Sequence, residues 1–216
     1  MTPVIFDLDG TLIDSAPDIH ATANAVLAQE GLAPLTLTQI RSFIGNGVVV
    51  LMQKVMAAQG LPAEGAQYER MLAEFVERYE AAVNLTTLYP NVAESLAALR
   101  AEGRAIGLCT NKPVAPTRSV LAHFGLLDSF AAIVGGDSLP QRKPDPAPLR
   151  HVLAALGGGP AVYVGDSEVD AATAQAAALP FALFTEGYRK TPVDDLPHNE
   201  SFDDFAALPG IVARLS

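Results

Sequence analysis

Short apolar runs alternate with stretches of helical spacing in the second half of the chain. Four of these runs are rich in β-forming residues, which predicts buried strands at residues 105–109, 131–135, 161–164 and 181–185. Between them, apolar residues recur at helical spacing around residues 92–99, 120–124, 149–156 and 171–178. Such alternation of strands and helices favours a parallel sheet that helices cover on both faces.

The segment between residues 15 and 85 shows helical spacing only. Ser15 is a good N-cap for a first helix that would stop at Gly31, and the apolar spacing predicts three more helices after it. A short apolar run at residues 4–6 predicts a strand in front of this segment. We therefore predict a doubly wound, Rossmann-like α/β core of residues 1–14 and 86–216, with a small helical domain of residues 15–85 inserted after the first strand.

The composition of the chain limits which binding partners and which cellular location we expect. The 216 residues are 50% hydrophobic and carry a net charge of −10, which argues against a nucleic-acid or anionic-membrane surface. No apolar run approaches the roughly 18 residues of a membrane span, and the first strand leaves no room for a signal peptide, so we expect a cytoplasmic protein. Cys109 is the only cysteine, which excludes a disulfide framework and predicts a buried, unreactive side chain. Monomer and homodimer both stay open.

Two aspartates, Asp7 and Asp9, directly follow the first predicted strand and precede Gly10 and Thr11. Residues at the carboxyl end of a strand in an open α/β sheet lie where ligands bind. Two carboxylates so close together repel each other, and a bound cation or a chemical task is the usual reason for such a pair. The alternative is a solvated strand end followed by a glycine turn.

Polar residues also follow three later strands. They are Thr110 and Asn111 after strand 105–109, Lys143 after strand 131–135, and Asp166 after strand 161–164, with Asp170 about one helical turn further on. Taken singly, each has an ordinary explanation as a helix cap or a loop residue. Because parallel strands end on one edge of the sheet, we expect all of them to lie beside Asp7 and Asp9.

This set of side chains suits phosphoryl transfer. The carboxylates of Asp7 and Asp166 are the hard oxygen ligands that Mg²⁺ prefers. Thr110, Asn111 and Lys143 would donate to phosphoryl oxygens, where charge must be held in the transition state. One aspartate would act as nucleophile, and the other would protonate the leaving oxygen and then activate water.

The motifs Asp7-Leu8-Asp9-Gly10-Thr11, Thr110-Asn111, Lys143 and Gly165-Asp166 with Asp170 resemble the four ordered motifs of the haloacid dehalogenase-like phosphohydrolases. The resemblance covers essentially the whole chain. It implies that Asp7 is the nucleophile and that Asp9 is the general acid/base, with its backbone carbonyl on Mg²⁺.

The same resemblance implies roles for the remaining motif residues and for the helical segment. Thr110, Asn111 and Lys143 would hold the phosphoryl group, Asp7 and Asp166 would ligate the metal by their carboxylates, and Asp170 would orient the metal shell. The helices of residues 15–85 would form a cap that closes over the site and excludes water.

Within that family the chain resembles the bacterial phosphoglycolate phosphatases. The segments that carry this resemblance are residues 14–19, 41–47, 110–113, 143–149 and 187–188. Two departures are visible: Ala178 stands where a glycine is usual, and Val48–Val50 are bulkier than the usual small residues. The second departure puts fine substrate selection in doubt.

The implied substrate, 2-phosphoglycolate, carries a carboxylate beside its phosphate, so a cation is expected near the site. Arg41 is our candidate from the cap, with Asn46 as a second donor, and Lys112 is an alternative from the core side. The ordinary alternative for Arg41 is a helix-surface arginine. A small cap favours small phosphorylated metabolites over macromolecules.

Other functions use similar residues. A phosphatase of a sugar phosphate or nucleotide stays open, as does a β-phosphoglucomutase-like mutase, although such mutases usually carry a histidine where this chain has Ile19. A dehalogenase would need neither Asp9 nor Mg²⁺. A phospho-accepting regulatory module would need neither Asp9 nor a cap, and an inactive phosphate-binding regulator is disfavoured because no motif residue is missing.

Overall fold

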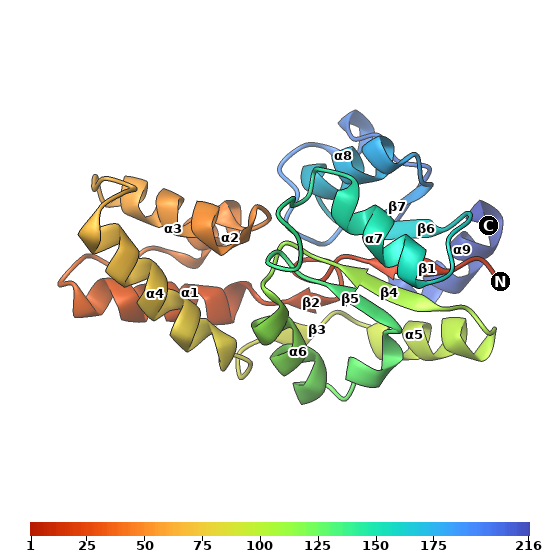
Figure 1. The fold of residues 1–216 in the computed structure, drawn as a ribbon, viewed down its shortest axis with the longest axis horizontal. Coiled ribbons are helices and arrows are strands. Elements are labelled where there is room, and N and C mark those ends of the chain that lie inside the picture. Colours follow the sequence, from red (N-terminus) through yellow and green to blue (C-terminus); the bar gives the residue numbers. More distant parts are fainter.

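The computed structural model describes residues 1–216 and shows a central sheet with four helices projecting from one end (Figure 1). All six strands of the sheet are parallel and follow the order β5-β4-β1-β6-β7-β8. Their bounds are Val4–Phe6 (β1), Ile106–Cys109 (β4), Ala132–Val134 (β5), Val162–Gly165 (β6), Phe181–Phe184 (β7) and Glu200–Phe202 (β8). The predicted α/β class with a parallel sheet is confirmed.

Helices cover both faces of the sheet because the central strands are apolar on both sides. On β1, Val4 and Phe6 join one buried cluster and Ile5 joins the other, as the two-residue period of a strand requires. The first face is covered by α5 (Val92–Ala101), α6 (Val114–His123) and α9 (Leu208–Leu215), and the second by α7 (Ala147–Ala155) and α8 (Glu168–Ala177).

The four projecting helices have a hydrophobic core of their own. They are α1 (Ala16–Gln29), α2 (Leu37–Phe43), α3 (Gly47–Ala58) and α4 (Ala66–Glu80), and 14 buried residues from this part of the chain form a separate cluster. Local sequence fixes the start of α2, where Thr36 and Gln39 form a capping box. None of the helices combines the length and apolar character needed to cross a membrane.

A short antiparallel ribbon joins the helices to the sheet. It pairs β2 (Ile13–Asp14) with β3 (Thr87–Leu88), so the chain leaves and re-enters the sheet region side by side. Asp18, at the start of α1, is buried and accepts from the Thr86 backbone N–H at 2.7 Å and from the Thr86 hydroxyl at 2.6 Å. The two connections are therefore held together at one place.

The predicted strands are confirmed to within two residues at each end, whereas β2, β3, β8 and α9 are elements that the sequence analysis did not predict. Cys109 is fully buried on β4, and burial raises the pKa of its thiol to about 12. Ala178, where the family usually has glycine, ends α8 in the left-handed conformation with φ 58°. That conformation costs an alanine about 1 kcal/mol or more.

Candidate active site

The predicted site residues gather at the carboxyl edge of the sheet. Asp7 directly follows β1, Thr110 and Asn111 follow β4, and Asp166 follows β6, while Lys143 comes from the loop between β5 and α7. All five are buried. Strands β1, β4 and β6 are neighbours in the sheet, so the fold itself brings their ends together.

Lys143 is the electrostatic centre of this cluster. Its ammonium lies 2.7 Å from Asp7 Oδ1 and 2.7 Å from Asp170 Oδ1, and it donates to the Tyr163 hydroxyl at 3.0 Å. Burial alone would lower the pKa of this lysine, but the two carboxylates outweigh burial and hold its pKa above the ordinary value. Lys143 therefore stays charged beside Asp7.

Asp170 is saturated with hydrogen bonds. Its Oδ1 accepts from Lys143 and, at 2.7 Å, from the Tyr163 hydroxyl, and its Oδ2 accepts from the Ser167 hydroxyl at 2.6 Å. Burial would raise the pKa of Asp170, yet the charge of Lys143 and these donors lower it overall. Asp170 is a permanent anion that holds Lys143 in place.

For Asp7 and Asp166, burial outweighs the effect of neighbouring donors and raises the pKa. Asp166 accepts only from neutral donors, the Thr11 hydroxyl at 2.8 Å and the Tyr188 backbone N–H at 2.6 Å, and burial raises its pKa well above the ordinary value. Burial likewise raises the pKa of Asp7 to about 7, although Lys143 acts against it. Carboxylate oxygens of Asp7, Asp166 and Asp170 lie within 4.8 Å of one another. These three carboxylates are the residues that could hold a metal ion.

Two glycines enclose Asp166. A Cβ on Gly10 would lie 2.5 Å from Asp166 Oδ2, and one on Gly187 would lie 2.3 Å from the same oxygen. Gly10 also has φ 91°, which an L side chain rarely adopts. The Gly10 turn therefore fixes both the spacing of the aspartate motif and the place of Asp166.

Asp9 is not part of the cluster formed by Asp7, Asp166 and Asp170. Its Oδ1 accepts from the Ser15 hydroxyl at 2.6 Å and from the Lys112 ammonium at 3.2 Å. The metal role that the sequence analysis predicted for the backbone carbonyl of Asp9 stays a prediction. The carboxylate of Asp9 contacts Ser15 and Lys112, on the side facing the helices.

The sequence analysis expected Asn111 to hold a phosphoryl group, and that role stays a prediction. Both N–H groups are used, one by the carbonyl of Gly45 at 3.0 Å and one by the carbonyl of Lys143 at 3.0 Å, and the amide oxygen accepts from the Lys143 backbone N–H at 3.0 Å. The side-chain amide of Asn111 therefore connects its own loop to the loops of Gly45 and Lys143.

Arg41 pairs with another residue of the chain, and its predicted role in substrate binding stays a prediction. Its guanidinium pairs with Asp14 Oδ2 at 2.8 Å and lies 5.4 Å from the centre of the Tyr188 ring, and it is absent from the residues that line the site. The carboxylate of Asp14, at the end of β2, holds it at the junction between helices and sheet. Asn46, in contrast, does line the space above Asp166.

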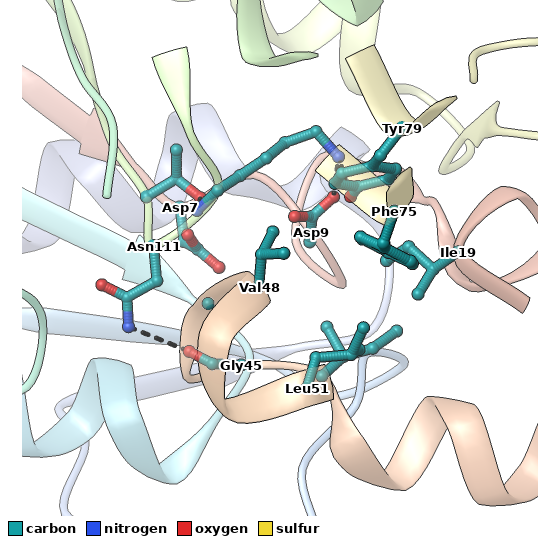
Figure 2. Close-up of a pocket in the computed structure, with 13 residues that line it drawn as sticks. Asp7, Asp9, Ile19, Gly45, Val48, Leu51, Phe75, Tyr79 and Asn111 are labelled. Carbon is teal, nitrogen blue, oxygen red and sulfur yellow. Dashed lines mark hydrogen bonds and ion pairs between the residues drawn. The ribbon is translucent and has the colours of Figure 1, made fainter. Parts of the chain in front are cut away.

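Two pockets meet over Asp7 and share Asp7, Asp9, Ile44 and Gly45. One extends over Asp166 and Lys143. The other encloses about 440 Å³, part of it open to solvent, and runs between the sheet edge and the helices. Figure 2 shows this second pocket, with Asp7 and Asn111 on one side and Ile19, Leu51 and Phe75 on the other.

The sequence analysis assigned no role to three residues that support the site. The Tyr163 hydroxyl accepts from Lys143, the Thr11 hydroxyl donates to Asp166, and the Tyr188 hydroxyl accepts from the backbone N–H of Ser15 at 2.8 Å. Tyr163 lies in the middle of an otherwise apolar strand, where its hydroxyl needs a buried hydrogen-bond partner. This pattern could have pointed to Tyr163 from the sequence alone.

The comparisons with known proteins agree with this geometry. Residues 4–184 match the family model described as haloacid dehalogenase-like hydrolase. The chain belongs to the haloacid dehalogenase-like hydrolases. A family member named phosphoglycolate phosphatase from Cereibacter sphaeroides is 57% identical over 216 residues, covering 100% of this chain and 99% of the relative.

Two further members of the haloacid dehalogenase-like hydrolases are similar over nearly their whole length. A phosphoglycolate phosphatase from Rhodobacter capsulatus is 51% identical over 97% of this chain and 95% of its own. The crystal structure of a protein from Haemophilus somnus, described as a predicted phosphoglycolate phosphatase, has a TM-score of 0.92 and 32% identity, covering 98% of this chain and 97% of that one. The prediction of a phosphatase of this family is confirmed.

Proposed function

We propose that this phosphatase hydrolyses 2-phosphoglycolate to glycolate and inorganic phosphate, depends on Mg²⁺, and forms an aspartyl phosphate on Asp7. The observation that carries the proposal is the setting of Asp7. Its carboxylate lines two pockets, lies 2.7 Å from the charged ammonium of Lys143, and lies within 4.8 Å of a second buried carboxylate, that of Asp166. Five relatives at 51–57% identity carry the name phosphoglycolate phosphatase.

The residues present fit a divalent metal ion. Asp7 and Asp166 offer oxygen ligands within 4.8 Å of each other, and both carboxylates are buried, which raises their pKa values. Asp170 is close enough to be a ligand, but its oxygens are occupied by Lys143, Tyr163 and Ser167, so it acts through Lys143. When bound, Mg²⁺ would neutralise charge on the phosphoryl oxygens and the carboxylates.

In the first step, an oxygen of Asp7 attacks phosphorus and the bond from phosphorus to the glycolate oxygen breaks. Lys143 and the Thr110 hydroxyl would hold the phosphoryl oxygens, while Asp9 gives its proton to the leaving oxygen. In the second step, Asp9 takes a proton from water, which attacks phosphorus. Inorganic phosphate leaves, and Asp7 is a carboxylate again.

We further propose that residues 15–85 act as a cap. The loop of Gly45, Asn46 and Gly47 lies over Asp7, and its contact with Asn111 joins the helices to the phosphate end of the site. The hinge would be the β2–β3 ribbon. A closed cap excludes water, which protects the aspartyl phosphate until the leaving group has departed.

Mutase activity is disfavoured by the same pocket. A mutase must hold a sugar phosphate in this pocket, and the wall on the side of the helices contains Ile19, Leu51 and Phe75, which offer no hydrogen-bonding groups. Sugar hydroxyls would also lose their hydrogen bonds to water against that wall.

The proposal is tested by measuring kcat/KM for a panel of small phosphate esters, with EDTA and after restoring Mg²⁺. We expect 2-phosphoglycolate to be the best substrate, with activity lost in EDTA and recovered with Mg²⁺. A sugar phosphate or a nucleotide as the best substrate would overturn the substrate class. Full activity in EDTA would overturn the metal dependence.

A further inference from the structure

Lys112 is a buried cation that the phosphoryl chemistry described above does not use. Its side chain is 3% exposed, its ammonium lies 3.2 Å from Asp9 Oδ1, and it also contacts the Tyr79 hydroxyl. The same ammonium lies 4.1 Å from the centre of the Tyr79 ring. Burying a lysine is costly, so a position with one shared carboxylate and one phenol calls for a further reason.

The pocket around Lys112 has a polar floor and an apolar wall. Lys112 is the only cation among its lining residues, and the two anions, Asp7 and Asp9, both belong to the phosphoryl end. The rest of the wall, contributed largely by the helices, is apolar: Ile19, Ile44, Val48, Leu51 and Phe75. A ligand whose phosphate sits at Asp7 would therefore extend past Asp9 toward Lys112.

We propose that Lys112 is the residue that selects the substrate, by binding a carboxylate carried at the far end of a short phosphate ester, with the Tyr79 hydroxyl as second donor. This inference rests on the proposed function and deepens it. The chain places Lys112 on the sheet unit and Tyr79 on α4, so a carboxylate bound between them touches both parts of the molecule. Binding of the correct substrate would thereby favour the closed arrangement.

The apolar wall of the pocket selects against substrates that carry hydroxyl groups. A two-carbon acid phosphate presents no hydroxyl to Ile19, Leu51 or Phe75, whereas a sugar phosphate would leave several hydroxyls without partners there. Inside such a pocket the attraction between an ammonium and a carboxylate is stronger than in water. The bulky Val48, one of the departures from the family pattern, is part of this wall.

The test compares Lys112→Met, which keeps the length of the side chain and removes its charge, with the wild type on two substrates. One is 2-phosphoglycolate and the other is ethyl phosphate, which has the same length and no carboxylate. The quantity compared is kcat/KM for 2-phosphoglycolate divided by kcat/KM for ethyl phosphate. We expect this substrate ratio to fall at least about tenfold in Lys112→Met, mainly through a higher KM for 2-phosphoglycolate. Because Lys112 also contacts Asp9, a loss shared equally by both substrates would reflect Asp9 alone and would overturn the proposal.

Two controls sharpen this comparison. Arg41→Ala removes a nearby cation that does not line the pocket, and it is expected to leave the substrate ratio unchanged. Tyr79→Phe removes only the second donor, so it is expected to lower the ratio less than Lys112→Met and supplies a test if Lys112→Met does not fold. An unchanged ratio in Tyr79→Phe, or a fall in Arg41→Ala, counts against the inference. Failure of the wild type to hydrolyse 2-phosphoglycolate would instead sink the proposed function.

Discussion

The side-chain amide of Asn111 donates to the carbonyl oxygen of Gly45 at 3.0 Å, which links the end of β4 to the loop that opens α3 (Figure 2). The two backbones are also close beside this bond, because a Cβ on Gly47 would lie 3.1 Å from the Asn111 carbonyl oxygen. The same amide holds the backbone of Lys143 through two further hydrogen bonds. One residue therefore sets both the position of the helices and the position of the lysine beside Asp7.

Asn111→Ala is expected to lower both stability and activity, since it removes the side-chain partner of three backbone groups, two of them buried. We expect the free energy of unfolding in urea to fall by about 2–3 kcal/mol, and kcat/KM to fall at least about tenfold. Asn111→Asp has nearly the same shape and keeps the acceptor, but its carboxylate faces two carbonyl oxygens, so it should be no better than alanine. Wild-type stability and turnover in both variants would show that the amide positions nothing.

Tyr163→Phe tests the support of Lys143. The hydroxyl accepts from Lys143 and donates to Asp170, so its removal weakens the placement of the ammonium without changing any charge. We expect a loss of about 1 kcal/mol in stability and a fall of severalfold in kcat. The measurement is steady-state kinetics alongside urea denaturation, and an unchanged kcat would mean that Asp170 alone suffices to place the lysine.

Gly187→Ala is expected to damage the metal site by steric conflict alone. The added methyl group would lie 2.3 Å from Asp166 Oδ2 and 2.3 Å from the Gly10 carbonyl oxygen. Asp166 must move, so the rise in melting temperature caused by Mg²⁺ should shrink or vanish. Gly210→Ala in α9 is the matched control, because its nearest neighbour is the end of the Arg214 side chain at 3.8 Å. If the two variants respond alike to Mg²⁺, Asp166 does not hold the metal.

The sequence predicted the parts of this protein that are encoded locally. Alternating apolar runs are enough to place β4 and β6, and parallel strands then bring Asp7 and Asp166 to one edge. The sequence could not predict the directions of the Asn111 and Arg41 side chains, because both are oriented by partners that lie far away in the sequence. The short strands β2, β3 and β8 have too few residues to show a period, and tertiary pairing alone defines them.

The response to Mg²⁺ is expected to depend on pH. Burial raises the pKa of Asp7 to about 7, so between about pH 4 and 7 this carboxyl holds a proton in the folded state that the unfolded chain has already released. Burial also raises the pKa of Asp166 well above its ordinary value, which acts in the same direction. Their contribution to stability therefore falls as pH rises through that window, and a divalent cation competes with the same protons.

The rise in melting temperature caused by saturating Mg²⁺ should accordingly be larger at about pH 8 than at about pH 6. Thermal unfolding at both values, with and without the ion, measures it. Asp7→Asn removes one of the titrating groups and should flatten the difference. A larger stabilisation at the lower pH would show that the ion binds elsewhere.

The central claim is that Asp7 attacks phosphorus. The most direct measurement is an acid-quenched single turnover with ³²P-labelled 2-phosphoglycolate and excess enzyme, followed by peptide mapping and treatment with hydroxylamine, which cleaves acyl phosphates. We predict a transient, hydroxylamine-sensitive label on the peptide that contains Asp7, and none in Asp7→Asn. Release of labelled phosphate with no label on that peptide at any time, or with the label on another residue, would contradict the account.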